Sequence, residues 1–193
     1  MTGESSPALS FDRGTLIVEG FSDAVMSRLE PWVKYDQRTK NWRAEARCYR
    51  DVATLLRDMK VVFTDHARAY SLLSLELQAP LVPRTHQSAA ISAWKSAGYR
   101  GVVSLPTGAG KTVLAVMCMS TLGRPTLICV PTIDLMHQWR GVLQKFFAVE
   151  VGMLGGGSQE VKDVTVATYD SAAIHAERLG PKFGLVIFDE CHH

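Results

Sequence analysis

Five short apolar segments recur through the C-terminal part of the chain, and their alternation with longer segments constrains the fold more than any other feature. They occupy residues 101–105, 126–130, 149–154, 164–168 and 184–188. Helical spacing is found between them, notably from Lys111 to Leu122 and from Thr132 to Phe147. Apolar strands that alternate with amphipathic helices indicate a parallel sheet covered on both faces. We therefore expect residues 79–193 to form a doubly wound α/β domain that binds its ligand at the carboxyl ends of the strands.

A phosphate-binding loop is indicated after the first of these segments, in the sequence SLPTGAGKTVL. Its glycines let backbone N–H groups approach an anion closely, and the helix that follows adds its positive end. Lys111 can reach the terminal phosphates of ATP, and Thr112 can offer its hydroxyl to Mg²⁺. The general pattern has a glycine where this chain has Leu105. The residues predicted to bind the nucleotide here are Pro106, Thr107, Gly108, Ala109, Gly110, Lys111 and Thr112.

An acidic pair, Asp189 and Glu190, follows the last apolar segment. Carboxylates that end a buried strand are costly unless a cation or hydrogen-bond donors meet them. We expect Asp189 to hold Mg²⁺ and Glu190 to polarise the water that attacks the γ-phosphate, with Lys111 as the third catalytic residue. The adjacent run from Cys191 to His193 is not expected to be a zinc site, because neighbouring ligands rarely close a tetrahedron.

The first part of the chain, residues 1–78, is predicted to be a small mixed α/β domain. Strands are expected at 14–21, as a pair within 33–49, and at 60–65, and helices at 22–29 and 50–58. Prolines at 80 and 83 interrupt regular structure and place a boundary there.

A basic stretch with aromatic residues runs from Lys34 to Arg50, where six basic side chains face two acidic ones. Trp42 and Arg43 are candidate nucleic-acid contacts, because such a pattern suits a phosphate backbone with stacked bases. A solvated hairpin whose tryptophan fills a small core explains the same residues equally well.

Membrane and secreted classes are disfavoured. The longest apolar run is far shorter than the roughly 18 residues that a span requires, and the start MTGESSPALS lacks the features of a signal peptide. Four cysteines without CxxC spacing indicate reduced thiols. We expect a cytoplasmic, nucleoid-associated protein.

In their order and spacing, the motifs resemble those of the N-terminal part of XPB-type superfamily 2 DNA helicases, in the archaeal and bacterial branch. PTGAGKT resembles motif I, CVPTIDLMHQW motif Ia, VGMLGGG the glycine motif after it, VATYDSA motif Ic and DECHH motif II. PRTHQSAAISAW resembles the stretch with an arginine, an aromatic residue and a glutamine, although His86 stands where the family usually has tyrosine. Residues 1–78 resemble the damage-recognition domain of the family more loosely.

The resemblance implies an ATP-dependent DNA helicase or translocase that acts in repair or transcription and uses ATP and Mg²⁺. It implies that Gln87 hydrogen-bonds adenine, with Arg84 nearby. It also implies that Thr132, Gly155, Gly156 and Thr168 contact the backbone of single-stranded DNA or a duplex junction. For Thr132, ordinary helix capping is an equally good explanation. A nuclease or transcription factors are the further partners that such a helicase would have.

The resemblance implies that residues 79–193 are the first RecA-like helicase domain, incomplete because it is truncated after motif II. Members of the resembled family continue into a second RecA-like domain. An arginine finger contributes about 10³ to 10⁵ in rate, so this chain alone is expected to bind ATP weakly and hydrolyse it negligibly. We expect an N-terminal piece with an exposed sheet edge, produced by choice of the expressed segment, a gene break or an intein. The alternative is a non-catalytic DNA- or partner-binding module on a vestigial nucleotide fold. A P-loop kinase would leave Gln87 and motifs Ia to Ic without a role.

Overall fold

The structure is a computed structural model that describes residues 6–191 and divides into two compact units. The first unit comprises the chain up to Tyr70 together with His175–Lys182, and the second comprises Ser71–Ile174 and the chain from Phe183 onward. Residues 71–78, which the sequence analysis placed with the first domain, pack in the second unit. The backbone N–H of Leu73 donates to the carbonyl of Gly123, and that of Gln78 donates to the carbonyl of Phe146.

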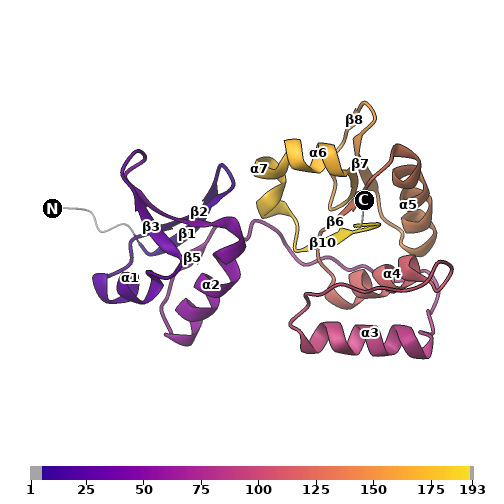
Figure 1. The fold of residues 1–193 in the computed structure, drawn as a ribbon, viewed down its shortest axis with the longest axis horizontal. Coiled ribbons are helices and arrows are strands. Elements are labelled where there is room, and N and C mark those ends of the chain that lie inside the picture. Colours follow the sequence, from indigo (N-terminus) through magenta and orange to yellow (C-terminus); the bar gives the residue numbers. More distant parts are fainter. Residues whose placement is uncertain (1–5, 192–193) are drawn as a thin grey trace. The chain divides into compact units, whose positions relative to one another are not determined.

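The first unit is built on a five-stranded sheet with the order β3-β4-β2-β1-β5 (Figure 1). The strands are β1 (Ala8–Asp12), β2 (Thr15–Glu19), β3 (Val33–Asp36), β4 (Asn41–Glu45) and β5 (Thr64–Asp65). Neighbouring strands are antiparallel, except that β5 runs parallel to β1. The helices of this unit are α1 (Asp23–Leu29), η1 (Ala46–Cys48), α2 (Tyr49–Asp58), α7 (Ala176–Leu179) and η2 (Gly180–Lys182). The predicted α/β class is confirmed.

The core of the first unit forms where α2 packs its apolar face on the sheet. Val52 and Leu56 of α2 are fully buried and belong to one cluster with Leu9, Leu16 and Val18 of the central strands. Strand β1 was not predicted. The strand predicted at 60–65 is wrong for residues 60–63, because only Thr64 and Asp65 pair with β1 and Val62 is 87% exposed.

Tyr49 gives this unit a specific sensitivity to alkaline pH. Its hydroxyl donates a 2.7 Å hydrogen bond to Asp65 Oδ2, and burial, followed by the bond to Asp65, raises the pKa of Tyr49 to about 12. Because this pKa lies above the unfolded value of 10.0, the stabilisation is complete below pH 10 and is lost as the pH rises towards 12. Urea unfolding of the first unit should therefore show a midpoint that falls over this range in wild type. The fall should be smaller in Tyr49→Phe, and an equal fall in both proteins would contradict the assignment.

The second unit contains the predicted parallel sheet, with the order β10-β6-β9-β7-β8 (Figure 1). Its strands are β6 (Thr126–Val130), β7 (Val151–Gly155), β8 (Ser158–Gln159), β9 (Val164–Thr168) and β10 (Leu185–Phe188). All pairs are parallel except the short antiparallel pair of β7 and β8. The helices are α3 (Thr85–Ser96), α4 (Lys111–Leu122), α5 (Ile133–Phe146) and α6 (Tyr169–Ile174).

Helices cover both faces of the central strands. Every residue of β6 and β7 is buried. The larger core cluster joins Met119 of α4 and Leu143 of α5 to Ile128 and Val166 of the sheet, while α6 lies on the opposite side of the sheet from α4 (Figure 1). Among residues 6–191, no helix is both long and apolar enough to cross a bilayer.

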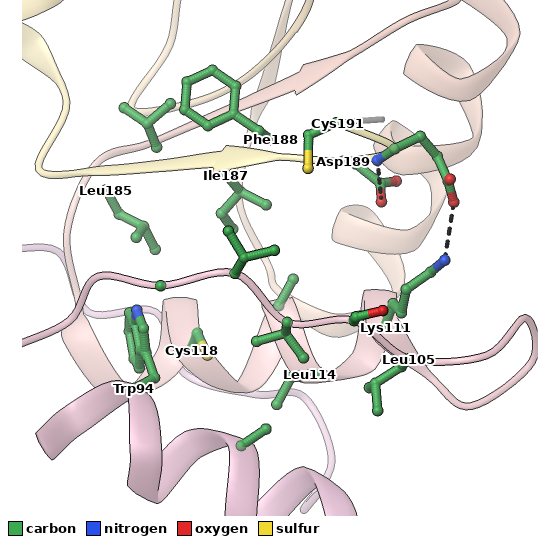
Figure 2. Close-up of a pocket in the computed structure, with 18 of the residues that line it drawn as sticks. Trp94, Leu105, Lys111, Leu114, Cys118, Leu185, Ile187, Phe188, Asp189 and Cys191 are labelled. Atoms are coloured by element: carbon green, nitrogen blue, oxygen red, sulfur yellow. Dashed lines mark hydrogen bonds and ion pairs between the residues drawn. The ribbon is translucent and has the colours of Figure 1, made fainter. Parts of the chain in front are cut away.

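The strand predicted at residues 101–105 is absent. Both edges of β6 are already paired, with β10 and β9. The segment instead runs along one side of a pocket of about 570 Å³, and β10 lines the other side (Figure 2). Val102 is 84% exposed and Phe188 of β10 is 59% exposed. Within the part of the chain that the structure describes, β10 is an edge strand that pairs only with β6, and residues 101–105 lie across the pocket from it without pairing with it.

Candidate nucleotide and nucleic-acid sites

The predicted phosphate loop has the backbone geometry of an anion cradle. Gly108 and Gly110 adopt the left-handed region, with φ of 78° and 87°, and α4 begins at Lys111 directly after the loop. A Cβ atom on Gly110 would lie 2.7 Å from Nε2 of Gln87, so only glycine fits there without displacing that side chain. The N-terminal N–H groups of α4 are thus presented at the end of a tight turn, an arrangement that binds phosphate.

The loop and the acidic pair, 79 residues apart in sequence, meet at the carboxyl end of β10. Nζ of Lys111 lies 3.2 Å from Oε1 of Glu190, and both side chains are about one-third exposed, at 35% and 29%. Figure 2 draws this ion pair as a dashed line from Lys111, and Asp189 lies nearby among the residues that line the pocket. The structure therefore brings Lys111, Asp189 and Glu190 together, as the sequence analysis expected.

Hydrogen bonds fix both the main chain and the carboxylate of Asp189. Its N–H donates to the carbonyl of Cys129 on β6 at 2.9 Å. Its Oδ1 accepts the N–H of Glu190 at 3.1 Å, and its Oδ2 accepts the indole N–H of Trp139 at 2.8 Å. Its carbonyl accepts the hydroxyl of Tyr169 at 2.9 Å. Burial raises the pKa of Tyr169, and nearby ionisable groups add to the shift, so this hydroxyl stays protonated and able to donate at neutral pH.

The donor set suits Mg²⁺ in complex with a nucleotide. Within residues 6–191, no three His, Cys, Asp or Glu side chains converge to hold a metal ion by themselves. Mg²⁺ is usually held by one or two carboxylates, a hydroxyl and the phosphates of the substrate, and Asp189 and Thr112 supply oxygens of these kinds. Cys191 is exposed, whereas the two histidines of the CHH run lie outside the described residues.

Gln87 lies against the phosphate loop and is 3% exposed. Its Oε1 accepts the N–H of Arg84 at 2.9 Å, and its Nε2 donates to the carbonyl of Gly110 at 3.1 Å. His86 contacts the carbonyl of Ala109 through Nε2 at 3.0 Å. Residues at the start of α3 thus hold the phosphate loop by hydrogen bonds to its carbonyl groups. A contact between Gln87 and adenine stays a prediction.

The predicted DNA contacts of the second unit gather at the carboxyl ends of three adjacent parallel strands. Thr132 follows β6, Gly155 ends β7 and Thr168 ends β9. A Cβ atom on Gly155 would lie 2.9 Å from Oγ1 of Thr168, and one on Gly156 would lie 3.1 Å from Cδ1 of Ile133. Both glycines adopt positive φ, at 136° and 57°, and a side chain at either position would press against Thr168 or Ile133, so the backbone at this edge requires glycine.

Two of these residues also have local structural roles. Oγ1 of Thr132 caps α5 by accepting the N–H of Leu135 at 3.2 Å. Oγ1 of Thr168 donates to Oγ of Ser171 at 2.9 Å. Thr132 therefore does cap α5. Its hydroxyl satisfies one N–H group at the start of the helix, and a helix N-terminus has further N–H groups that can bind an anion.

In the first unit, Trp42 and Arg43 have different environments. Trp42 is 39% exposed and packs edge-on against Tyr35, with ring centroids 5.3 Å apart. The Arg43 side chain is only 15% exposed and bonds Asp12 at 2.8 Å. It also contacts Asp36 at 3.5 Å. Arg43 thus connects β4 to residues of β1 and β3, whereas the Tyr35–Trp42 pair is exposed to solvent.

Comparisons with known proteins match both parts of the chain. Residues 80–193 match the family model described as "Type III restriction enzyme, res subunit", and residues 9–67 match the "Xeroderma pigmentosum group B helicase damage recognition domain". The "DNA 3'-5' translocase XPB2" of Sulfurisphaera tokodaii is 40% identical over 163 residues, which is 84% of this chain and 37% of that protein. The chain belongs to the XPB-type superfamily 2 helicases.

Other matches support membership of the XPB-type family. The "DNA 3'-5' helicase XPB" of Mycobacterium tuberculosis is 36% identical over 115 residues, covering 54% of this chain and 21% of that protein. The chain therefore spans well under half of the curated relatives it matches. The crystal structure of the UvsW helicase from bacteriophage T4 aligns with 97% of this chain and 83% of its own, with a TM-score of 0.50 and 16% identity. At this identity the likeness shows the fold alone.

Two contacts of this XPB-type site were missed by the sequence analysis: those of Trp139 and Tyr169 with Asp189. The sequence contains one indication of each contact. Trp139 lies on the apolar face of a predicted helix, and a buried indole N–H needs an acceptor. Tyr169 directly follows the strand adjacent to β6, but the strand order that brings it near Asp189 is not readable from sequence.

Proposed function

We propose that this chain forms the ATP-binding and DNA-gripping N-terminal part of an ATP-dependent DNA helicase or translocase that acts in repair or transcription. The observation that carries the proposal is the 3.2 Å approach of Lys111 Nζ to Glu190 Oε1. It places the lysine of a phosphate loop opposite an acidic pair, the two halves of an NTP-hydrolysing site. The family membership supports the use of ATP.

Each side chain has a definite task in this proposal. The N–H groups at Gly108 and Gly110 cradle the phosphates, and Lys111 donates to the terminal phosphate. Thr112 and Asp189 would hold Mg²⁺ with the nucleotide, and the chemistry supplied by the bound cation would be neutralisation of charge on the phosphate oxygens. Glu190 orients a water molecule and accepts its proton as the water oxygen attacks the γ-phosphorus and the bond to ADP breaks.

DNA is the second ligand. Thr132, Gly155, Gly156 and Thr168 are proposed to bind the phosphate backbone through the N–H groups and hydroxyls exposed at the strand ends. Trp42 is proposed to stack on an unpaired base. The damage-recognition model that residues 9–67 match supports a role in repair, with a nuclease or transcription factors as partners of the whole protein.

The experiment is a titration of the purified chain with a fluorescent ATP analogue, with and without Mg²⁺, followed by anisotropy. We expect saturable binding that Mg²⁺ strengthens and that unlabelled ATP competes away. A parallel titration with labelled single-stranded DNA should give binding that weakens steeply with salt. A chain that binds DNA but shows no Mg²⁺-dependent nucleotide binding would instead be the non-catalytic module.

A further inference from the structure

Asp189, the proposed Mg²⁺ ligand, is contacted by two aromatic side chains from two different helices. Trp139 on α5 donates from Nε1 to Oδ2 of Asp189 at 2.8 Å. Tyr169, the first residue of α6, donates from its hydroxyl to the backbone carbonyl of Asp189 at 2.9 Å. One contact fixes the carboxylate and the other fixes the main chain that carries it.

The contact from Trp139 sets the orientation of the carboxylate. Trp139 is 3% exposed and belongs to the main core cluster, so packing holds its ring in place. The indole N–H of Trp139 donates to Oδ2, while Oδ1 accepts the N–H of Glu190 at 3.1 Å. A carboxylate held by a donor on each oxygen keeps one rotamer, and each oxygen retains a lone pair for a cation.

The contact from Tyr169 steadies the point at which β10 ends. Its ring stacks on Phe188, with centroids 6.1 Å apart and planes 11° apart. Phe188 is the last residue of β10, and Glu190 adopts a left-handed conformation with φ of 53°. The chain therefore turns sharply where the acidic pair lies. A hydrogen bond to the carbonyl of Asp189 holds that turn against α6.

We propose that Trp139 and Tyr169 are positioning residues that pre-orient Asp189 for Mg²⁺. They act through Asp189 and need not touch the nucleotide. Partners that orient metal ligands typically contribute 10- to 100-fold in metal affinity. Lys111 and the glycine loop bind the phosphates by separate contacts, so nucleotide affinity without metal does not depend on either aromatic residue. The inference rests on the proposed function, since it needs a Mg²⁺–nucleotide complex at this site.

The test measures the Mg²⁺ requirement of nucleotide binding. At a fixed concentration of fluorescent ATP analogue, Mg²⁺ is titrated into wild type, Trp139→Phe and Tyr169→Phe, which each remove a donor and keep a ring. We expect the Mg²⁺ concentration at half-maximal response to rise about 10- to 100-fold in Trp139→Phe, and by a smaller factor in Tyr169→Phe. Affinity for the analogue in EDTA should stay within about twofold of wild type, since the phosphate contacts are unchanged.

Matched controls separate positioning from general loosening. Trp94→Phe makes the same change at a tryptophan that lines the same pocket but packs edge-on against Tyr99, with centroids 5.2 Å apart. Tyr99→Phe makes the same change as Tyr169→Phe at a side chain that is 44% exposed. Neither control should shift the Mg²⁺ requirement. If Trp139→Phe fails to fold, as urea unfolding would reveal, Tyr169→Phe carries the test alone.

The outcomes distinguish two failures. If wild type binds the analogue with a clear Mg²⁺ dependence and neither variant shifts it, the positioning role is wrong and the proposed function stands. An equal loss of affinity with and without metal would also refute positioning, since it would show a general structural effect. If wild type shows no Mg²⁺-dependent binding, the proposed function itself fails.

Discussion

Lys111→Ala is expected to weaken binding of ATP by about 10- to 100-fold. Hydrogen bonds to charged groups contribute about 1.5–3 kcal/mol, and each 1.4 kcal/mol corresponds to a factor of ten in affinity. Lys111 opens α4 directly after the glycine loop, so no other cation of the loop can replace it. Fluorescence anisotropy with the ATP analogue, in Mg²⁺, measures the change.

Folding should be nearly unaffected by Lys111→Ala. The ion pair with Glu190 joins side chains that are 35% and 29% exposed, and pairs in such positions contribute roughly 1 kcal/mol or less. Lys145→Ala, near the end of α5, removes the same charge away from the loop and should leave ATP affinity unchanged. Equal affinity in wild type and Lys111→Ala would show that the nucleotide does not bind at this loop.

Phe147→Ala should destabilise the second unit by about 3–5 kcal/mol, the usual cost of removing a buried phenylalanine ring. Phe147 is 1% exposed and lies in the main core cluster. It directly follows α5, and its backbone bridges to Leu77, so the cavity would open where residues 71–78 join the sheet domain. Urea unfolding of wild type and Phe147→Ala, followed by circular dichroism at one protein concentration, measures the loss of stability.

Phe188→Ala is the matched control for this cavity. Phe188 is 59% exposed at the edge of the same sheet, so the same truncation removes little buried surface and should cost well under half as much. Similar losses in the two variants would mean that the core does not centre on α5.

The sequence predicted best those elements whose local signals and tertiary environment agree. Helix α4 begins and ends where it was expected, at Lys111 and Leu122, because glycines in left-handed conformations flank it. Strands β6 and β9 also match their predicted ranges, since buried parallel strands read as continuous apolar runs. The meeting of Lys111 with the acidic pair was also predicted, although residues 101–105 before the loop are not a strand; helix α4, which begins at Lys111, contacts β10 directly.

The elements and contacts that were predicted wrongly are those that depend on strand pairing and packing rather than on the local sequence pattern. Residues 101–105 have strand composition, yet they do not pair with β10, the edge strand across the pocket, and β propensity alone does not form a ladder. Strand β1 was missed, and its place in the structure comes from its pairing with β2 and β5. The contacts of Trp139 and Tyr169 with Asp189 span 50 and 20 residues, and only the packed sheet reveals them.

The short separation of Lys111 from Glu190 means that each satisfies the other's charge before any substrate arrives. In the proposed function, a triphosphate that enters the glycine turn draws the ammonium group of Lys111 away from the carboxylate of Glu190. The acid then faces the incoming water molecule at the same moment that the phosphate gains its cation. Binding of the nucleotide and release of the carboxylate of Glu190 to act as a base are thereby a single exchange of partners. Without nucleotide, Lys111 and Glu190 remain paired with each other.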